Sequence, residues 1–348
     1  MDRRSKTSKG TNMKRDGNNS IPLLGLDVGT SRIVIARPDG DGHQFTTQLN
    51  AFVSVPYSKM TEIALQREQI PFSARDGELV VQGDEAHRFA DLLSVETRRP
   101  MRKGILNPDE ADGLTVIQKL VESLAADDSR AQGRVCFTVP AAPASGRESL
   151  SYHEASLRHT LEQMGFEARS INEGLAVIYS ELEDTNYTGI GISCGGGLCN
   201  VTLAYLSMPV LSFSIPKAGD FIDASAAAKT GDLANRIRIA KETSFHFNGH
   251  FIDKLHQVLT VYYEDMIQTL IGVAKEAFAS SRRMPKLGKP IPIVLSGGTA
   301  LPSGFRERFE KILTASEFPV SISEIRMARD PLHTAAKGAL VAAQAELG

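Results

Sequence analysis

The chain has 348 residues, of which 42% are hydrophobic and 23% charged, which is typical of a folded globular protein. Its formal net charge of −2 gives no support for nucleic-acid binding. Three cysteines fit a reducing cytoplasm better than a disulfide framework, and no apolar run reaches the roughly 18 residues of a membrane-spanning helix. We therefore expect a cytoplasmic protein of about two domains.

Residues 1–20 differ in composition from the rest of the chain. They contain six Lys or Arg residues and two Asp, with almost no apolar side chains. Such a segment cannot bury enough surface to fold, so we predict a disordered basic tail. The alternative is a basic arm that contacts a membrane surface, nucleic acid or a partner protein. The segment is not amphipathic, so direct membrane insertion is not predicted.

The first half of the chain is predicted to begin with a hairpin. Two apolar strands at 21–27 and 31–37 are joined by a glycine-containing turn. Alternation and helical periodicity then predict strands at 51–56, 78–82, 134–139 and 166–171, and helices at 84–93, 109–126, 149–164 and 174–183.

The second half begins with the same pattern. Strands at 190–193 and 199–206 flank a run of three glycines. Further strands are predicted at 210–215 and 291–295, and helices at 221–229, 232–243, 252–280, 303–315 and 331–347. Each half thus opens with a hairpin and continues with alternating helices and strands, which predicts two similar α/β domains in tandem.

The first hairpin turn, LDVGTSR at 26–32, has the chemistry of a phosphate cradle. A turn of small residues exposes several backbone N–H groups that can bind an anion. Asp27 ends the first strand, and a carboxylate beside a phosphate usually serves a hydrated Mg²⁺. The alternative is an ordinary hairpin with an aspartate in its turn.

The second glycine turn, GISCGGGLCN at 191–200, repeats this geometry. A glycine triplet weakens a strand unless something approaches the backbone closely, which favours a second phosphate hairpin. The alternative is a metal site built on Cys194 and Cys199. Their spacing is wider than that of usual metal-binding pairs, and no histidine pattern accompanies them. We expect both cysteines to be packing residues.

Two more stretches carry candidate site residues. In IVLSGGTALPSG (293–304), a strand ends at Gly297 and Gly298, where a nucleoside or a phosphate could approach, although a simple strand–helix turn would look the same. Glu173 opens a helix in SINEGLAVIYS (170–180). It either caps that helix or holds an attacking water molecule.

Taken in this order, the motifs resemble the sugar kinase, heat-shock-70 and actin superfamily. The stretches NAFVSVP, VVQGDEAHRF, RRPMRKGILN and KAGDFID narrow the resemblance to the bacterial actins of the MreB and MamK type. The resemblance covers roughly residues 21–346. It implies the actin-like ATPase fold, with two tandem RNase H-like α/β domains around a nucleotide cleft.

The resemblance also implies domain boundaries, cofactors and partners. Domain I would span 21–172, with a small subdomain at about 50–105, and domain II would span 173–348. The closing helix at 331–347 would pack back on domain I. The implied cofactors are ATP and Mg²⁺, and the implied partners are ATP or ADP and further copies of the chain in a filament.

The resemblance assigns the phosphate and metal contacts. Asp27 would organise Mg²⁺ through water, and Glu173 would position the attacking water. The residues implied to hold the β- and γ-phosphates from the two sides are Gly29, Thr30, Ser31, Gly195, Gly196 and Gly197.

The resemblance also assigns the contacts to the nucleoside. Gly297, Gly298 and Thr299 would meet the adenosine. RIRIAKE (236–242) resembles the helix that carries a lysine–glutamate pair to the adenine and ribose, which places Lys241 and Glu242 there. The alternative for this pair is a solvated helix surface.

Two departures from the family pattern affect the expected function. Ser193 lies in the second phosphate loop, where the family has an acidic residue, so we expect ATP to bind but to be hydrolysed slowly. The chain between KAGDFID and residue 252 is short, so we expect a reduced small subdomain IIB. The leading hypothesis is a filament-forming actin-like protein. The alternatives are a non-polymerising nucleotide-dependent binding or chaperone-like module and, less well supported, a sugar kinase.

Overall fold

The computed structural model describes residues 22–125, 133–144, 150–281, 285 and 287–345. The predicted basic tail lies outside the described residues. We refer to residues 22–172 as the first half of the molecule and to 173–345 as the second half.

A five-stranded sheet forms the centre of the first half. Its strands are β1 (Leu23–Val28), β2 (Arg32–Asp39), β3 (Gly42–Leu49), β9 (Arg134–Val139) and β10 (Glu167–Asn172), in the order β10-β9-β1-β2-β3. The predicted hairpin is the antiparallel pair β1–β2, and β9 and β10 are parallel to β1. The sequence did not predict β3, because no residue of this edge strand is fully buried and its sequence is mostly polar.

The second half repeats this sheet. Its strands are β11 (Gly189–Cys194), β12 (Cys199–Tyr205), β13 (Met208–Ile215), β14 (Ile291–Ser296) and β15 (Ile322–Met327), in the order β13-β12-β11-β14-β15. In both sheets the first strand lies at the centre. On one side the next two strands follow in an antiparallel meander, and on the other side lie two strands parallel to the first. This repetition confirms the predicted pair of similar α/β units.

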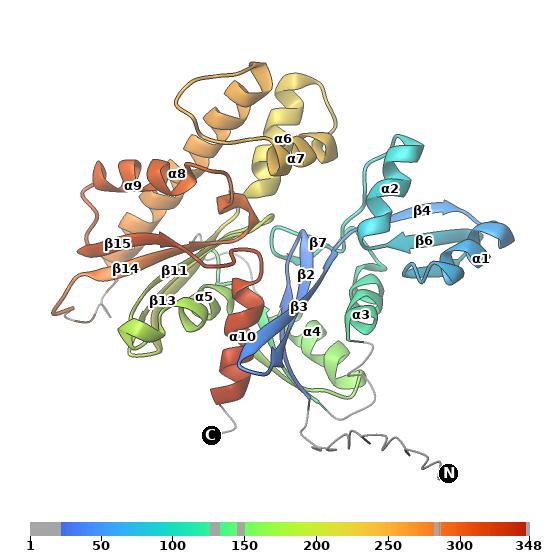
Figure 1. Cartoon of the computed structure of the whole chain (residues 1–348), viewed down its shortest axis with the longest axis horizontal. Coiled ribbons are helices and arrows are strands. Elements are labelled where there is room, and N and C mark those ends of the chain that lie inside the picture. Colours follow the sequence, from blue (N-terminus) through green and yellow to red (C-terminus); the bar gives the residue numbers. More distant parts are fainter. Residues whose placement is uncertain (1–21, 126–132, 145–149, 282–284, 286, 346–348) are drawn as a thin grey trace, which may run out of the picture.

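Helices cover both sheets and fill the space between them (Figure 1). Those on the first sheet are α3 (Gly113–Leu124) and α4 (Ser151–Gln163), and those on the second are α8 (Lys254–Ser280) and α9 (Phe305–Thr314). Between the sheets lie α5 (Glu173–Glu181) and α10 (Thr334–Ala345), whose apolar residues form one core with strands of both halves. None of the described helices is long and apolar enough to cross a membrane.

Two glycines allow α10 to pack unusually close to its neighbours. A Cβ at Gly25 of β1 would lie 2.1 Å from the carbonyl oxygen of Ala336, and a Cβ at Gly338 would lie 1.8 Å from that of Ala176 in α5. These backbone-to-backbone contacts leave no room for a side chain. The closing helix therefore contacts the central strand of the first half and the first helix of the second half at the same time.

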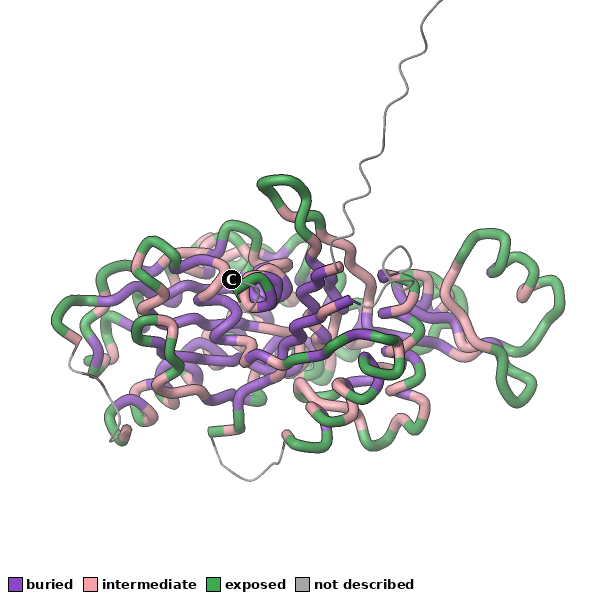
Figure 2. The backbone as a smooth tube through the Cα atoms, turned by 90° about the horizontal axis from the view of Figure 1, so that it is seen from below, coloured by how far each residue is buried: buried purple, intermediate pink, exposed green. Residues whose placement is uncertain are grey.

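Each half also carries a smaller unit outside its central sheet (Figure 1). In the first half it consists of α1 (Lys59–Arg67), α2 (Asp84–Leu93), the sheet β4 (Phe52–Pro56), β5 (Phe72–Arg75) and β6 (Glu78–Gln82), and the hairpin β7 (Met101–Arg102) and β8 (Ile105–Leu106). In the second half it consists of α6 (Gly219–Thr230) and α7 (Ala234–Thr243), without a strand between 216 and 253. Figure 2 shows buried backbone concentrated in the central strands and exposed loops at the periphery.

Candidate functional site

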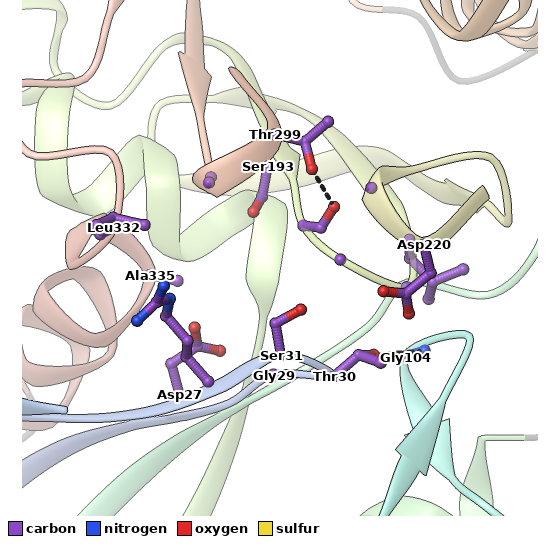
Figure 3. Close-up of a pocket in the computed structure, with 18 of the residues that line it drawn as sticks. Asp27, Gly29, Thr30, Ser31, Gly104, Ser193, Asp220, Thr299, Leu332 and Ala335 are labelled. Atoms are coloured by element: carbon purple, nitrogen blue, oxygen red, sulfur yellow. Dashed lines mark hydrogen bonds between the residues drawn. The ribbon is translucent and has the colours of Figure 1, made fainter. Parts of the chain in front are cut away.

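A cavity of about 260 Å³ lies between the two halves and is lined by both (Figure 3). Its walls come from the β1–β2 turn, the start of α5, the β11–β12 turn, α6, α7, the turn after β14 and the start of α10. All the residues that the sequence proposed for a site line this cavity, namely Asp27, Gly29, Thr30, Ser31, Glu173, Ser193, Gly195, Gly196, Gly197, Lys241, Glu242, Gly297, Gly298 and Thr299.

The turns of the two hairpins meet tip to tip. A Cβ at Gly196 would lie 2.3 Å from the Ser31 hydroxyl oxygen, and a Cβ at Gly197 would lie 2.4 Å from that of Thr30. The Gly195 N–H donates to the Leu198 carbonyl at 2.9 Å, which closes the second turn. The glycine triplet is thus the part of β11–β12 that lets the two halves approach each other.

The hydroxyl groups on the first turn are held by a hairpin that the sequence did not predict. The Gly104 N–H, between β7 and β8, donates to the Thr30 hydroxyl oxygen at 3.0 Å, and the Arg99 guanidinium donates to that of Ser31 at 3.3 Å. Because both hydroxyl oxygens accept these bonds, both hydroxyl protons can be donated to an anion in the cavity. Figure 3 shows Thr30 and Ser31 on the wall opposite Ser193 and Thr299.

Two carboxyl groups, those of Asp27 and Glu173, line the cavity. Asp27 ends β1 and accepts a hydrogen bond from Thr138 on β9, and burial raises its pKa. Glu173 opens α5, whose N-terminus is capped by the Asn172 side chain. Burial, and next the negative charge of Asp27, raise the pKa of Glu173 to about 8 although a hydrogen bond from Ser193 opposes this.

Ser193 and Asn200 together hold the Glu173 carboxyl group. The Ser193 hydroxyl donates to Oε1 and the Asn200 amide donates to Oε2, both at 2.6 Å. Asn200 is fully buried, and its own carbonyl oxygen accepts from the Ala141 N–H at 2.9 Å. The sequence analysis did not identify Asn200. An amide side chain in the mostly apolar strand β12 does suggest a buried hydrogen-bonding role.

The donor chemistry of this region fits Mg²⁺. Carboxylate oxygens are the ligands this ion prefers, and Asp27 and Glu173, whose pKa values are raised mainly by burial, are two carboxyl groups that a bound cation would stabilise in the charged form. Within the described residues, no group of three or more His, Cys, Asp or Glu side chains could hold a metal ion by itself. Most ligands of a bound Mg²⁺ would therefore have to be phosphate oxygens and water.

The cysteines of the glycine stretch do not point to a metal. Cys194 and Cys199 are paired in register across β11 and β12, and both are fully buried in the core beneath the cavity. The Cys199 thiol donates to the Lys217 carbonyl. They are the packing residues that the sequence led us to expect.

At the other end of the cavity, α7 presents Lys241 and Glu242. The Lys241 ammonium lies 2.7 Å from the Asp223 carboxylate, and both side chains are buried. Glu242 pairs with Arg32 of the first half at 3.0 Å. Leu301 and Leu332 add apolar surface to the cavity wall. A flat ligand with polar edges, such as a nucleobase, has both surfaces it needs here.

The turn after β14 is fixed to the second hairpin. The Thr299 hydroxyl donates to the Gly195 carbonyl at 2.7 Å (Figure 3). Gly297 has a φ of +90°, and a Cβ there would lie 2.3 Å from the Cys194 carbonyl oxygen. Only glycine meets both requirements, which explains its position at the end of the strand.

Several charged residues at the site were not singled out from the sequence. Arg99 donates to the Asp220 carboxylate at 2.8 Å and so joins the first half to the start of α6. Asp223 and Arg238 also line the cavity. Arg99 contacts Asp220 across 121 residues and Arg238 contacts His87 across 151, so local spacing and periodicity could not have placed these two arginines in the site.

The chain matches a family model described as Volactin over residues 23–343. Among solved structures, it is similar to "MamK double helical filament", at 18% identity and a TM-score of 0.66, with 93% of this chain and 99% of that chain covered. It is also similar to MreB5 of Spiroplasma citri bound to ADP, at 15% identity and a TM-score of 0.65, with 92% of this chain and 95% of that chain covered.

A third similar structure is the ethanolamine utilization protein EutJ from Carboxydothermus hydrogenoformans, at 15% identity and a TM-score of 0.56, with 92% of this chain and 90% of that chain covered. These likenesses confirm the predicted actin-like fold. No curated protein sequence gives a significant match to this chain.

Proposed function

The chain belongs to the Volactin family, and from this we propose that it is an actin-like protein that binds ATP with Mg²⁺ between its two halves and assembles into filaments. The observation that carries the proposal is the cavity itself. Two glycine-bearing hairpins from different halves meet there, with two carboxyl groups beneath them and a polar–apolar slot at the far end.

In this proposal the two hairpins hold the phosphates. The N–H groups of Gly29 and Gly195 close their own turns, so the donors for the phosphates are the N–H groups of Gly196 and Gly197 and the hydroxyl protons of Thr30 and Ser31. Asp27 holds Mg²⁺ through water, and a bound Mg²⁺ would offset the negative charge of the phosphates and of both carboxyl groups. Lys241, Glu242 and the turn at 297–299 hold the nucleoside.

We further propose that hydrolysis is slow. Glu173 is the group in the cavity that can orient an attacking water molecule, and Ser193 and Asn200 fix the direction of its carboxyl group. With a pKa of about 8, this group binds a proton at neutral pH until a cation approaches. Ser193 supplies a hydroxyl rather than a second carboxylate, so less negative charge is available to organise the metal.

Nucleotide binding would favour the closed form of the cleft, and the closed form would be the one that assembles. MamK and MreB5, to which the chain is similar, are described as a double helical filament and as an ADP complex respectively. A non-polymerising binding module would bind nucleotide in the same cavity. The two functions are therefore distinguished by an assembly assay and not by a binding assay. We place the protein in the cytoplasm, where ATP is available.

Titration with a fluorescent ATP analogue in the presence of Mg²⁺ tests the binding site. A Cβ at Gly197 would lie 2.6 Å from the Gly104 backbone nitrogen, so Gly197→Ala should weaken binding at least tenfold. Gly272→Ala is the matched control, since no atom lies within 4 Å of the added carbon. Equal affinities of the two variants, or no binding by the natural chain, would overturn the proposal.

A further inference from the structure

The small unit of the first half contacts α7 of the second half at two points. The backbone N–H of Ala234, the first residue of α7, donates to the Glu96 carboxylate at 2.9 Å. The Arg238 guanidinium contacts the His87 imidazole on α2. The partners are 138 and 151 residues apart in the sequence, so these contacts form only when the two halves close on each other.

The N-terminus of α7 has no cap of its own. Its N-cap residue is Leu233, which makes no side-chain hydrogen bond to the helix. The first turn of a helix leaves backbone N–H groups without partners and carries partial positive charge. A carboxylate meets both needs. Asp232 accepts from the Leu233 N–H at 2.8 Å, but the N–H of Ala234, the first residue of the helix, donates to Glu96 from the other half of the molecule.

Arg238 places a second contact one turn further along α7. It is 5% exposed, and the distance to its ion-pair partner Glu242 is long, at 4.0 Å. Burial first, and then the charges of Arg238 and Arg99, lower the pKa of His87 to about 4, although Asp91 and Glu242 oppose this. At neutral pH the imidazole is therefore uncharged and can accept a hydrogen bond from Arg238.

The same helix brings Lys241 and Glu242 to the cavity. These residues lie three and four positions after Arg238, so all three share one side of the helix. Glu242 also pairs with Arg32 of the β1–β2 turn. The first residues of α7 thus contact the small unit, and its last turn lies at the nucleoside end of the cavity.

We propose that Glu96 and His87 are positioning residues that hold α7 over the cavity and thereby slow the release of nucleotide. This inference rests on the proposed function. Release requires the cleft to open, and opening would separate the Ala234 N–H from Glu96 and the Arg238 guanidinium from His87. A nucleotide held by Lys241 and Glu242 would in turn keep α7 in place, so occupancy of the cavity and closure of the small unit favour each other.

Stopped-flow release of a fluorescent ATP analogue tests this. Glu96→Ala should raise the dissociation rate constant about five- to tenfold, the effect expected for loss of a helix cap, with little change in the association rate constant. Glu96→Gln should restore slow release, because its amide oxygen can still accept from Ala234. Glu68→Ala, an exposed position at the end of α1, is the control and should release at the natural rate.

Equal release rates in Glu96→Ala and Glu68→Ala would overturn this inference and leave the proposed function standing. Failure of the natural chain to bind the analogue would overturn both. The double variant Glu96→Cys and Ala234→Cys gives a readout that does not depend on nucleotide. A short thiol cross-linker should join the two halves because these positions are in contact, and the buried Cys136, Cys194 and Cys199 should not compete for it. Absence of the cross-link in the folded protein would show that the contact does not form.

Discussion

Replacement of Glu173 by glutamine probes the cavity floor without removing side-chain volume. Asn200 cannot rotate to suit the new group, because its carbonyl oxygen already accepts from the Ala141 N–H. The glutamine carbonyl would therefore accept from Asn200, and its NH₂ would donate to Ser193, whose hydroxyl can act as acceptor as well as donor. We expect Glu173→Gln to fold with its hydrogen bonds intact.

The pH dependence of stability should then separate the two proteins. The Glu173 pKa is raised from 4.5 to about 8, so the folded chain holds a proton that the unfolded chain has lost across this range. Stability of the natural protein is thus lost as pH rises from 4.5 to 8, by at most about 1.4 kcal/mol per pH unit. Between pH 5 and 8 this sums to about 4 kcal/mol, an upper limit that solvent in the cavity reduces. The glutamine variant has no such loss.

Urea unfolding of both proteins at pH 5, 6, 7 and 8, without nucleotide or metal, measures the difference. The free energy of unfolding of Glu173→Gln, relative to that of the natural protein, should increase steadily as pH rises. Ser193→Ala, which removes a hydrogen bond that lowers the Glu173 pKa, should extend the pH-dependent loss to higher pH. A stability difference that stays constant across this range would refute the raised pKa and the burial on which it rests.

Three further predictions concern hydrolysis, packing and acid stability. Ser193→Asp should accelerate Mg²⁺-dependent ATP hydrolysis at least several-fold over the natural chain in a phosphate-release assay, with Ser193→Ala unchanged or slower; no acceleration would contradict the role given to this serine. Gly338→Ala should cost several kcal/mol of unfolding free energy because its Cβ meets the Ala176 carbonyl oxygen, whereas Gly272→Ala, exposed in a helix, should gain about 0.5–1 kcal/mol; similar effects would refute the close packing of α10. Burial lowers the His153 pKa to about 4, so stability should fall as pH drops from 6.5 towards 4, and His153→Leu should flatten this dependence; an unchanged profile would contradict it.

Motifs that combine glycine with a neighbouring polar group could be located from the sequence. The hairpins around Gly29 and Gly196 and the turn at Gly297 each need glycine for a tight turn or for the close approach of another segment, and glycine in such a turn is visible in the sequence itself. The order of these motifs, through their resemblance to the actin superfamily, placed them around one cavity. The repeated strand order followed from the same hairpin opening each half.

The rest depended on contacts between distant segments. Arg99 and Glu96 acquire their partners only when the halves are folded together, and Asn200 holds Glu173 from 27 residues away, so no local spacing in the sequence reveals them. The edge strands β3 and β15 escaped prediction for a different reason. They are only partly buried, and their exposed polar residues weaken the apolar alternation that marks a strand.

The central claim is that ATP binding between the two halves leads to assembly. High-speed sedimentation with negative-stain microscopy of the full chain, with ATP and Mg²⁺, with ADP and without nucleotide, tests it most directly. The proposed function predicts filaments in the pellet with ATP, and far fewer with ADP or without nucleotide. Gly197→Ala should stay in the supernatant under all three conditions. A natural chain that binds ATP yet remains monomeric in every condition would contradict the filament function and favour the non-polymerising module.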